Sequence, residues 1–255
     1  MPQYPAVSVF DVDNTLIVGS LWQHTVKQVL LEAPSRVPRY MVERGITAIS
    51  QMVWRRNDNV PEQPKTALRL VSRVDPESRN YIIDYVVDSL VREALRPGAV
   101  DTLIQRRKAG DRIFFVSDCF DFCLAKFAAR LGGADIIATR TFENSDGSLA
   151  LNSGEKPCVG LEKLARLKDH FDGERRPPFI RAYGHDQADY ALLSWADAGT
   201  AVNPDAKSIG QAQAMGLSVV DWSVGINDAS VHRPAVPGAP KRSTPQETGQ
   251  KSSNQ

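Results

Sequence analysis

The feature that most constrains the fold is a long gap in an otherwise regular alternation of strands and helices. Short β-rich runs alternate with amphipathic stretches along most of the chain, but no convincing strand lies between residues 17 and 95. Alternation of this kind is typical of right-handed βαβ crossovers, which build a mostly parallel sheet with helices on both faces. The predicted fold class is therefore α/β, with a Rossmann-like parallel sheet core and a small all-helical insertion.

The elements of the core are expected from apolar runs bounded by turn residues. Residues 140–151 are the exception to the alternation, because Ser145-Asp146-Gly147-Ser148 is a turn signal between the short segments 139–142 and 149–151 and predicts a β-hairpin. The expected strands are 6–10, 112–116, 135–139, 179–183, 200–202 and 217–220. The expected core helices are 99–109, 122–131, 161–170 and 190–196.

The insertion after the first strand is expected to form a separate helical cap. Ligands of α/β sheets bind beyond the carboxyl ends of the strands, which is where such an insertion lies; a purely structural appendage is the alternative. We expect a catalytic core of residues 1–16 and 96–225, a cap of residues 17–95 and a disordered tail of residues 226–255, which is rich in Pro, Ser and Gly and has no aromatic residue. The expected cap helices are 21–31, 40–55, 64–74 and 79–92.

Composition excludes several classes of protein. The chain has 255 residues, with 31 Lys and Arg against 30 Asp and Glu, so its net charge of +1 argues against a protein that binds nucleic acid through a basic face. Three cysteines are too few and too unevenly spaced for a disulfide framework or a zinc site. We see no signal peptide and no apolar run that could span a membrane, so we expect a cytoplasmic protein without a membrane partner.

Two aspartates directly after the first strand carry the chemistry. Asp11 and Asp13 are two residues apart, so in extended chain both carboxylates point the same way. Carboxylates at the end of a buried strand are costly unless they bind a metal or accept hydrogen bonds. Phosphoryl transfer through an aspartyl phosphate suits this pair. Asp11 would attack phosphorus, and Asp13 would protonate the leaving alcohol and later deprotonate water.

Four motifs in order resemble the haloacid dehalogenase superfamily of phosphatases. The first is Asp11-Val12-Asp13-Asn14-Thr15, the second Phe115-Val116-Ser117, the third a lysine before a helix, and the fourth Tyr183-Gly184-His185-Asp186-Gln187-Ala188-Asp189. With the helical cap in place, the chain most resembles the phosphoserine-phosphatase-like subgroup (subfamily IB) over residues 6–222. Further strings that fit this subgroup are Arg96-Pro97-Gly98-Ala99, Cys158-x-Gly160-x-Glu162-Lys163 and Ala201-Val202-Asn203-Pro204-Asp205.

The resemblance assigns further residues to the phosphate. It implies that the Ser117 hydroxyl holds a phosphate oxygen and that a lysine neutralises charge in the transition state. Lys163 is favoured for this role, and Lys156 is the alternative. Thr15 and Asp118, which belong to or follow the first two motifs, are further candidate substrate-binding residues.

A divalent metal is the implied cofactor. Hard oxygen ligands suit Mg²⁺, which would bridge Asp11, the main-chain carbonyl of Asp13, the phosphate and an acidic residue of the fourth motif. The chain departs from the superfamily here, because His185 stands where the metal-binding aspartate is usual. Asp186 or Asp189 would then supply the oxygen, or His185 would coordinate, or metal binding is lost.

The position that reads the substrate also departs from the subgroup. Phosphoserine phosphatases usually carry a glutamate nine residues after the nucleophile, and this chain has Ser20 there. We therefore predict a Mg²⁺-dependent phosphomonoester phosphatase that acts on a small metabolite, with a sugar-like or polyol-like phosphate favoured over phosphoserine. The alternatives are a phosphotransferase that uses the same intermediate and a non-catalytic binding protein of the same fold.

Overall fold

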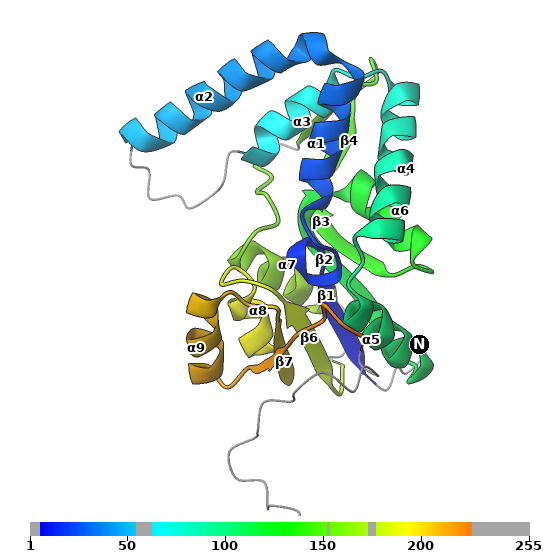
Figure 1. The fold of residues 1–255 in the computed structure, drawn as a ribbon, viewed down its shortest axis with the longest axis vertical. Helices are drawn as coiled ribbons and strands as arrows, with labels where there is room; N and C mark the ends of the chain where they lie inside the picture. Colours follow the sequence, from blue (N-terminus) through cyan, green and yellow to red (C-terminus); the bar gives the residue numbers. More distant parts are fainter. Residues whose placement is uncertain (1–5, 55–62, 152–153, 173–176, 226–255) are drawn as a thin grey trace, which may run out of the picture.

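The core of the molecule is a six-stranded parallel sheet covered by helices on both faces (Figure 1). The structure is a computed structural model, and it describes residues 6–54, 63–151, 154–172 and 177–225. The strand order is β3-β2-β1-β6-β7-β8, and each pairing between neighbours is parallel. This confirms the predicted α/β fold class. The strands are β1 (Val7–Asp11), β2 (Arg112–Phe120), β3 (Asp135–Thr139), β6 (Ile180–Gly184), β7 (Ala198–Val202) and β8 (Ser218–Val220).

The two faces of the sheet belong to different apolar clusters. Side chains alternate along a strand, so Val9 and Phe114 face one cluster while their neighbours Phe10 and Phe115 face the other. Because both faces are covered, all five residues of β1 are buried. The sheet centre, where β1 ends, is therefore shielded from water. The core helices are α5 (Pro97–Lys108), α6 (Asp121–Arg130), α7 (Leu161–Asp172), α8 (Tyr190–Trp195) and α9 (Ala206–Ala214).

The insertion between β1 and β2 is helical. Its apolar residues, such as Val29 and Ile83, belong to the same buried cluster as Phe120 and Leu124 of the core, so the cap and one face of the sheet share a continuous apolar interior. Figure 1 shows α4 running beside α6, and α2 extending away from the other cap helices. The cap helices are α1 (Leu21–Glu32), α2 (Val37–Trp54), α3 (Gln63–Ser72) and α4 (Pro76–Glu93).

The predicted hairpin ties the core to the cap. Strands β4 (Thr141–Glu143) and β5 (Leu149–Leu151) pair antiparallel. The buried guanidinium of Arg79 donates hydrogen bonds to the carbonyl of Gly147 (2.9 Å) and to the carboxylate of Glu143 (3.1 Å). One strand therefore docks on the start of α4.

Most elements lie within a few residues of their predicted bounds. The main difference is β2, which continues to Phe120 beyond the predicted end at residue 116, with a shift in its register to β3 between Val116 and Phe120. The predicted disordered tail lies outside the described residues. Within the part of the chain that the structure describes, no helix is long and apolar enough to cross a membrane. The three cysteines are free and buried.

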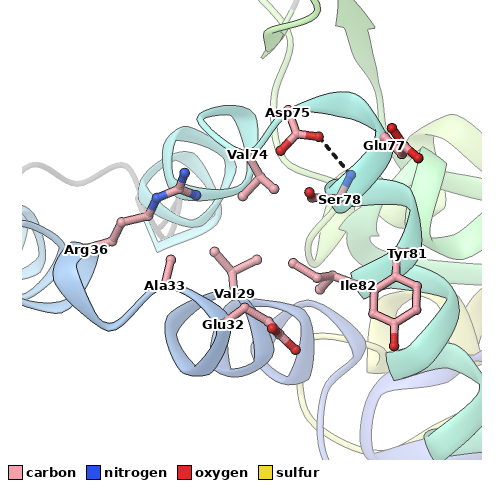
Figure 2. A pocket seen from close by; sticks show the side chains of 10 residues that line it. All are labelled: Val29, Glu32, Ala33, Arg36, Val74, Asp75, Glu77, Ser78, Tyr81 and Ile82. Carbon is pink, nitrogen blue, oxygen red and sulfur yellow. Dashed lines mark hydrogen bonds between the residues drawn. The ribbon is translucent and has the colours of Figure 1, made fainter.

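A cavity of about 460 Å³ lies inside the cap, between α1 and the start of α4 (Figure 2). Val29 and Ile82 line it together with the acidic side chains of Glu32 and Asp75. None of the residues predicted to carry the chemistry lines this cavity. It is therefore separate from the site at the end of β1.

Candidate active site

A tight turn after β1 folds the first motif back on itself. Residues Val12–Leu16 form an irregular turn in which Asp13 and Asn14 are not helical, and Asn14 adopts the left-handed region with φ of 58°. Asn14 is suited to this conformation because its short polar side chain forms local hydrogen bonds; here its side-chain oxygen accepts from the Gly19 N–H at 3.0 Å. The turn brings the Thr15 hydroxyl to 2.6 Å from Asp11 Oδ2, to which it donates.

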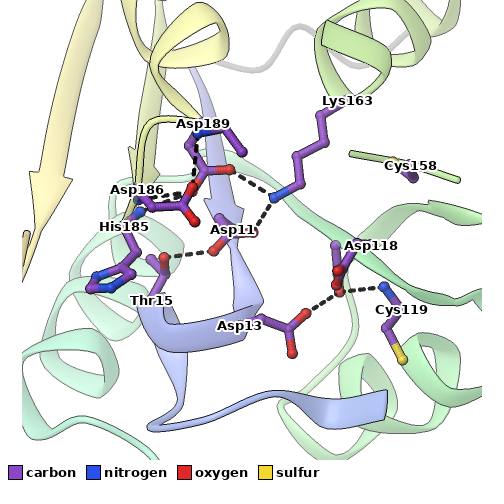
Figure 3. Close-up of polar contacts among 12 residues, drawn as sticks. Asp11, Asp13, Thr15, Asp118, Cys119, Cys158, Lys163, His185, Asp186 and Asp189 are labelled. Atoms are coloured by element: carbon purple, nitrogen blue, oxygen red, sulfur yellow. Dashed lines mark hydrogen bonds and ion pairs between the residues drawn. The ribbon is translucent and has the colours of Figure 1, made fainter. Parts of the chain in front are cut away.

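The centre of the site is a buried ion cluster (Figure 3). Lys163 Nζ, from the first turn of α7, lies 2.7 Å from Asp11 Oδ1 and 2.7 Å from Asp189 Oδ1. The exposed fractions are 1% for Asp11, 6% for Lys163 and 2% for Asp189, so water screens these charges little. Two carboxylates share one ammonium group, which leaves the cluster one negative charge in excess when all three are ionised.

Burial and the neighbouring charges shift the protonation of this cluster. Burial and the negative charge of Asp189 raise the pKa of Asp11 well above its usual value, against the opposing effect of Lys163. Burial alone would lower the pKa of Lys163, but the carboxylates of Asp11 and Asp189 hold it well above its ordinary range. Lys163 therefore stays charged at neutral pH. Because the cluster has an excess negative charge, a bound cation beside Asp11 would stabilise it.

Asp13 lies at the joint between cap and core. Its Oδ1 accepts a hydrogen bond from the N–H of Leu21, the first residue of α1, at 2.5 Å. Its Oδ2 accepts from the hydroxyl of Ser117 at 2.6 Å, and the Ser117 oxygen accepts from the N–H of Cys119 at 2.9 Å. The predicted acid–base residue and the predicted phosphate-binding hydroxyl are therefore in direct contact.

Asp118 is the second acidic residue beside Asp13. The hydroxyl of Thr139 donates to the main-chain carbonyl of Asp118 at 2.8 Å, where β2 and β3 lose their regular register. The Asp118 carboxyl interacts with the side chains of Asp13 and of Trp22 on α1. Burial, followed by the negative charge of Asp13, raises the pKa of Asp118 to about 8.

The fourth motif forms a loop after β6. Asp189 Oδ2 accepts from the N–H of His185 at 2.9 Å, so both carboxylate oxygens of Asp189 are engaged. His185 Nδ1 lies 3.0 Å from the carbonyl oxygen of Val202, and a carbonyl can only accept, so this nitrogen is the donor. Asp186 is exposed, and its side chain accepts from the N–H of Ala188 at 2.9 Å.

The donor set fits Mg²⁺ only in part. Among the described residues, no three His, Cys, Asp or Glu side chains form a group that could hold a metal ion. The oxygens of Asp11, the main-chain carbonyl of Asp13 and the exposed carboxylate of Asp186 are nevertheless of the kind that Mg²⁺ prefers. Mg²⁺ is commonly held by one or two carboxylates together with substrate phosphate and water. The residues therefore fit an ion that the protein and the phosphate hold jointly.

The structure separates the predicted residues into two groups. Asp11, Thr15, Lys163 and Asp189 form the ion cluster, while Asp13, Ser117 and Asp118 lie beside it. Lys156, the alternative lysine, is exposed, and its main-chain carbonyl accepts a hydrogen bond from Arg166. The structure does not bring its side chain to Asp11.

Three further residues belong to the site. Ser20 was a predicted candidate, whereas Trp22 and Thr139 were not. Ser20 is only 6% exposed, and its hydroxyl has no hydrogen-bond partner in the part of the chain that the structure describes. Trp22 follows on α1 and contacts Asp118; among four tryptophans, its position two residues after Ser20 is the available sequence signal. Thr139 positions Asp118. Thr139 is the last residue of the predicted strand 135–139, and this position could have identified it as a site residue.

Known proteins support the superfamily. Residues 8–194 match the model of the haloacid dehalogenase-like hydrolases. The protein CicA of Caulobacter vibrioides is 26% identical over 203 residues, which cover 77% of this chain and 86% of CicA.

Solved structures resemble the fold. One is a protein of unknown function from Bordetella pertussis, with a TM-score of 0.72, 21% identity and coverage of 86% of this chain and 100% of the other. Another is a phosphoserine phosphohydrolase-like protein from Francisella tularensis, with a TM-score of 0.53, 22% identity and coverage of 84% and 94%. The family model matches well over half of the chain, and it includes the residues that surround Asp11. The chain therefore belongs to the haloacid dehalogenase-like hydrolases.

Proposed function

We propose that this chain is a phosphomonoester phosphatase that works through a phosphorylated Asp11. The observation that carries the proposal is the Asp11 carboxylate, buried at the end of β1 and held by the Lys163 ammonium and the Thr15 hydroxyl. A carboxylate fixed in this way is positioned to attack, and the ammonium offsets the repulsion between two anions. Membership in a hydrolase family agrees with this chemistry.

The first step transfers the phosphoryl group to the protein. An Asp11 oxygen forms a bond to phosphorus while the bond between phosphorus and the alcohol oxygen breaks. Asp13, which enters the step protonated, gives its proton to the departing oxygen. The Ser117 hydroxyl, which donates to Asp13 in the absence of substrate, would turn to a phosphate oxygen and release Asp13 for this task.

The second step returns Asp11 to its starting state. Asp13, now a carboxylate, takes a proton from water as the water oxygen bonds to phosphorus. The bond between phosphorus and the Asp11 oxygen breaks, and inorganic phosphate leaves. Lys163 stays paired with Asp189 throughout, so the ammonium remains in place while the charge on Asp11 changes.

We propose Mg²⁺ as the cofactor, held by the Asp11 carboxylate, the Asp13 main-chain carbonyl and Asp186. When bound, Mg²⁺ supplies positive charge and orients the phosphate. Asp186 is favoured over Asp189 because both oxygens of Asp189 already accept hydrogen bonds. As substrate we propose a small metabolite with a sugar-like or polyol-like leaving group, because the neutral hydroxyl of Ser20 lies at the start of the cap.

The proposal is tested by turnover and by trapping the intermediate. We expect the wild type to hydrolyse p-nitrophenyl phosphate with Mg²⁺, to lose activity with a chelator, and to gain the mass of a phosphoryl group on Asp11 after rapid acid quenching. Asp11→Asn should show neither activity nor adduct. A phosphoryl adduct on another residue, or full activity in Asp11→Asn, would falsify the mechanism.

The second candidate function is phosphoryl transfer to an alcohol, because the same intermediate serves both reactions. Adding glycerol to the assay separates the two. A phosphatase releases one phosphate per nitrophenol, whereas a transferase yields glycerol phosphate and less free phosphate.

A further inference from the structure

Helix α2 of the cap presents apolar side chains to solvent. Met41 and Val42 are each 60% exposed. The side of α2 that faces the rest of the cap instead carries Tyr40, which is buried, and Glu43, which pairs with Arg73 at 3.1 Å just after α3. A surface helix of a globular protein normally turns its apolar stripe towards the core. In α2, apolar residues of this kind face water.

The apolar sequence pattern extends along the whole helix. Figure 1 shows α2 leaving the other cap helices on its way to Trp54. Steps of three and four residues keep to one side of an α-helix. The exposed Val37 lies one such step before Met41. Further apolar residues follow Val42 at steps of four, three and four residues: Ile46, Ile49 and Val53. The sequence therefore predicts a continuous apolar stripe on the helix.

The charges of α2 and its neighbour α3 are mostly positive. The two helices carry one acidic residue, Glu43, and four basic ones: Arg39, Arg44, Lys65 and Arg69. All four basic residues are exposed, whereas the net charge of the whole chain is only +1. A helix with an apolar stripe and neighbouring cations is typical of a segment that lies at the surface of an anionic membrane.

We propose that α2 docks the cap on an anionic lipid surface. The helix lies in the plane of the interface, where Met41 and Val42 leave water and the basic residues approach lipid phosphates. We expected no membrane partner because no apolar run could span a bilayer, but a helix that lies in the interface needs no such run. A second copy of this chain is a less favourable occupant, because it would bring two positively charged pairs of α2 and α3 together. The proposed function does not depend on this inference.

The test is flotation of the full chain with lipid vesicles. We expect binding to vesicles of equal parts phosphatidylcholine and phosphatidylglycerol, and binding at least about tenfold weaker to phosphatidylcholine alone, which lacks the negative surface potential. Met41→Ser with Val42→Ser should lower binding to the mixed vesicles by about tenfold or more, because two apolar side chains no longer leave water. Both residues are exposed, so we expect this variant to fold. The matched control is Ile209→Ser with Met215→Ser, an exposed apolar pair in and directly after α9, which should bind like the wild type.

Arg39→Gln with Arg44→Gln tests the charges separately. We expect binding to the mixed vesicles to fall by about fivefold for each arginine removed. No binding of the wild type to the mixed vesicles, or equal binding of the wild type and the variant with Met41→Ser and Val42→Ser, overturns the inference. A dimer in sedimentation velocity without vesicles that this variant abolishes also overturns it, because a second copy then covers the stripe. Hydrolysis of p-nitrophenyl phosphate in solution reports on the proposed function independently, and it should be the same in all these variants.

Discussion

The two halves of the site differ in how completely their charges are paired. On the core side, the Lys163 ammonium bridges Asp11 and Asp189, and the Thr15 hydroxyl donates to Asp11. On the side that faces the cap, the carboxyl groups of Asp13 and Asp118 interact with each other, and the Ser20 hydroxyl has no hydrogen-bond partner among the described residues. The core half is therefore a network of paired charges, whereas the cap half brings two carboxyl groups together without a cation between them.

Under the proposed function, we expect this difference to separate the reaction at phosphorus from the choice of leaving group. A phosphate group is common to all phosphomonoesters, so the residues proposed to bind it can be held in one arrangement at the sheet edge. The leaving group varies, and the half that meets it draws on the first turn of α1, which belongs to the insertion. Changes to Asp11 and Lys163 should therefore alter rate and stability, and changes beside the first turn of α1 should also alter which substrates react.

The largest effect is expected at Asp11. Asp11→Asn should lower kcat by at least about 10³-fold, as removal of a nucleophile commonly does. It should also raise the thermal midpoint, because the folded state binds the Asp11 proton more tightly than the unfolded state. Ionised Asp11 therefore costs stability as pH rises above its unfolded pKa.

Thermal unfolding at pH 5 and pH 8 checks this prediction. The stability gain of Asp11→Asn should be larger at pH 8, and Asp169→Asn, an exposed change on α7, should show no gain. A lower midpoint for Asp11→Asn at both pH values would mean that the pair with Lys163 outweighs the cost of burial.

Lys163→Met should have the opposite effect on stability. The change leaves Asp11 and Asp189 as two buried carboxylates without their shared cation, so we expect the free energy of unfolding to fall by about 3–5 kcal/mol. Denaturant titration measures the loss. Lys156→Met is the matched control, because its exposed side chain should contribute within about 0.5 kcal/mol. Equal losses in both variants would contradict the assignment of Lys163 to the ion cluster.

On the cap side, Asp118→Asn should change how stability depends on pH. The pKa of Asp118 is raised to about 8, so the wild type loses stability as pH rises from its unfolded pKa towards 8. The variant lacks this loss. Its stability relative to the wild type should therefore increase by about 3 kcal/mol between pH 5 and pH 8 and then level off. A constant difference across this range would show that Asp118 does not titrate near pH 8.

The two aspartates of the first motif and Ser117 could be predicted from sequence because they follow the ends of strands. Asp11 and Asp13 are two residues apart after an apolar strand, and parallel strands place Ser117 at the same edge. The choice between Lys163 and Lys156 required the structure, because both lysines precede or open the same helix. Only Lys163 turns inwards, where α7 begins beside the sheet edge.

The contacts of the cap half could not be predicted in the same way, although its residues Asp13, Asp118 and Ser20 were named as candidates. The contact between Trp22 and Asp118 depends on how α1 packs against the end of β2, and no periodicity in either segment encodes it. The extension of β2 to Phe120 likewise depends on partners that are distant in sequence, including the Thr139 hydroxyl. Tertiary contacts between two separately predictable elements therefore set the geometry on this side of the site.

The smallest expected loss of stability concerns the contact between the cap and the hairpin of the core. Arg79, with a side chain only 5% exposed, fastens α4 to the hairpin through Gly147 and Glu143. Arg79→Met should lower the free energy of unfolding by about 1–2 kcal/mol, because a buried carbonyl loses its donor. Arg130→Met breaks exposed ion pairs between α6 and α4 and should cost less, since water screens such pairs. A larger loss for Arg130→Met than for Arg79→Met in a denaturant titration would contradict this prediction. The main contact between cap and core would then lie along α6 and not at the hairpin.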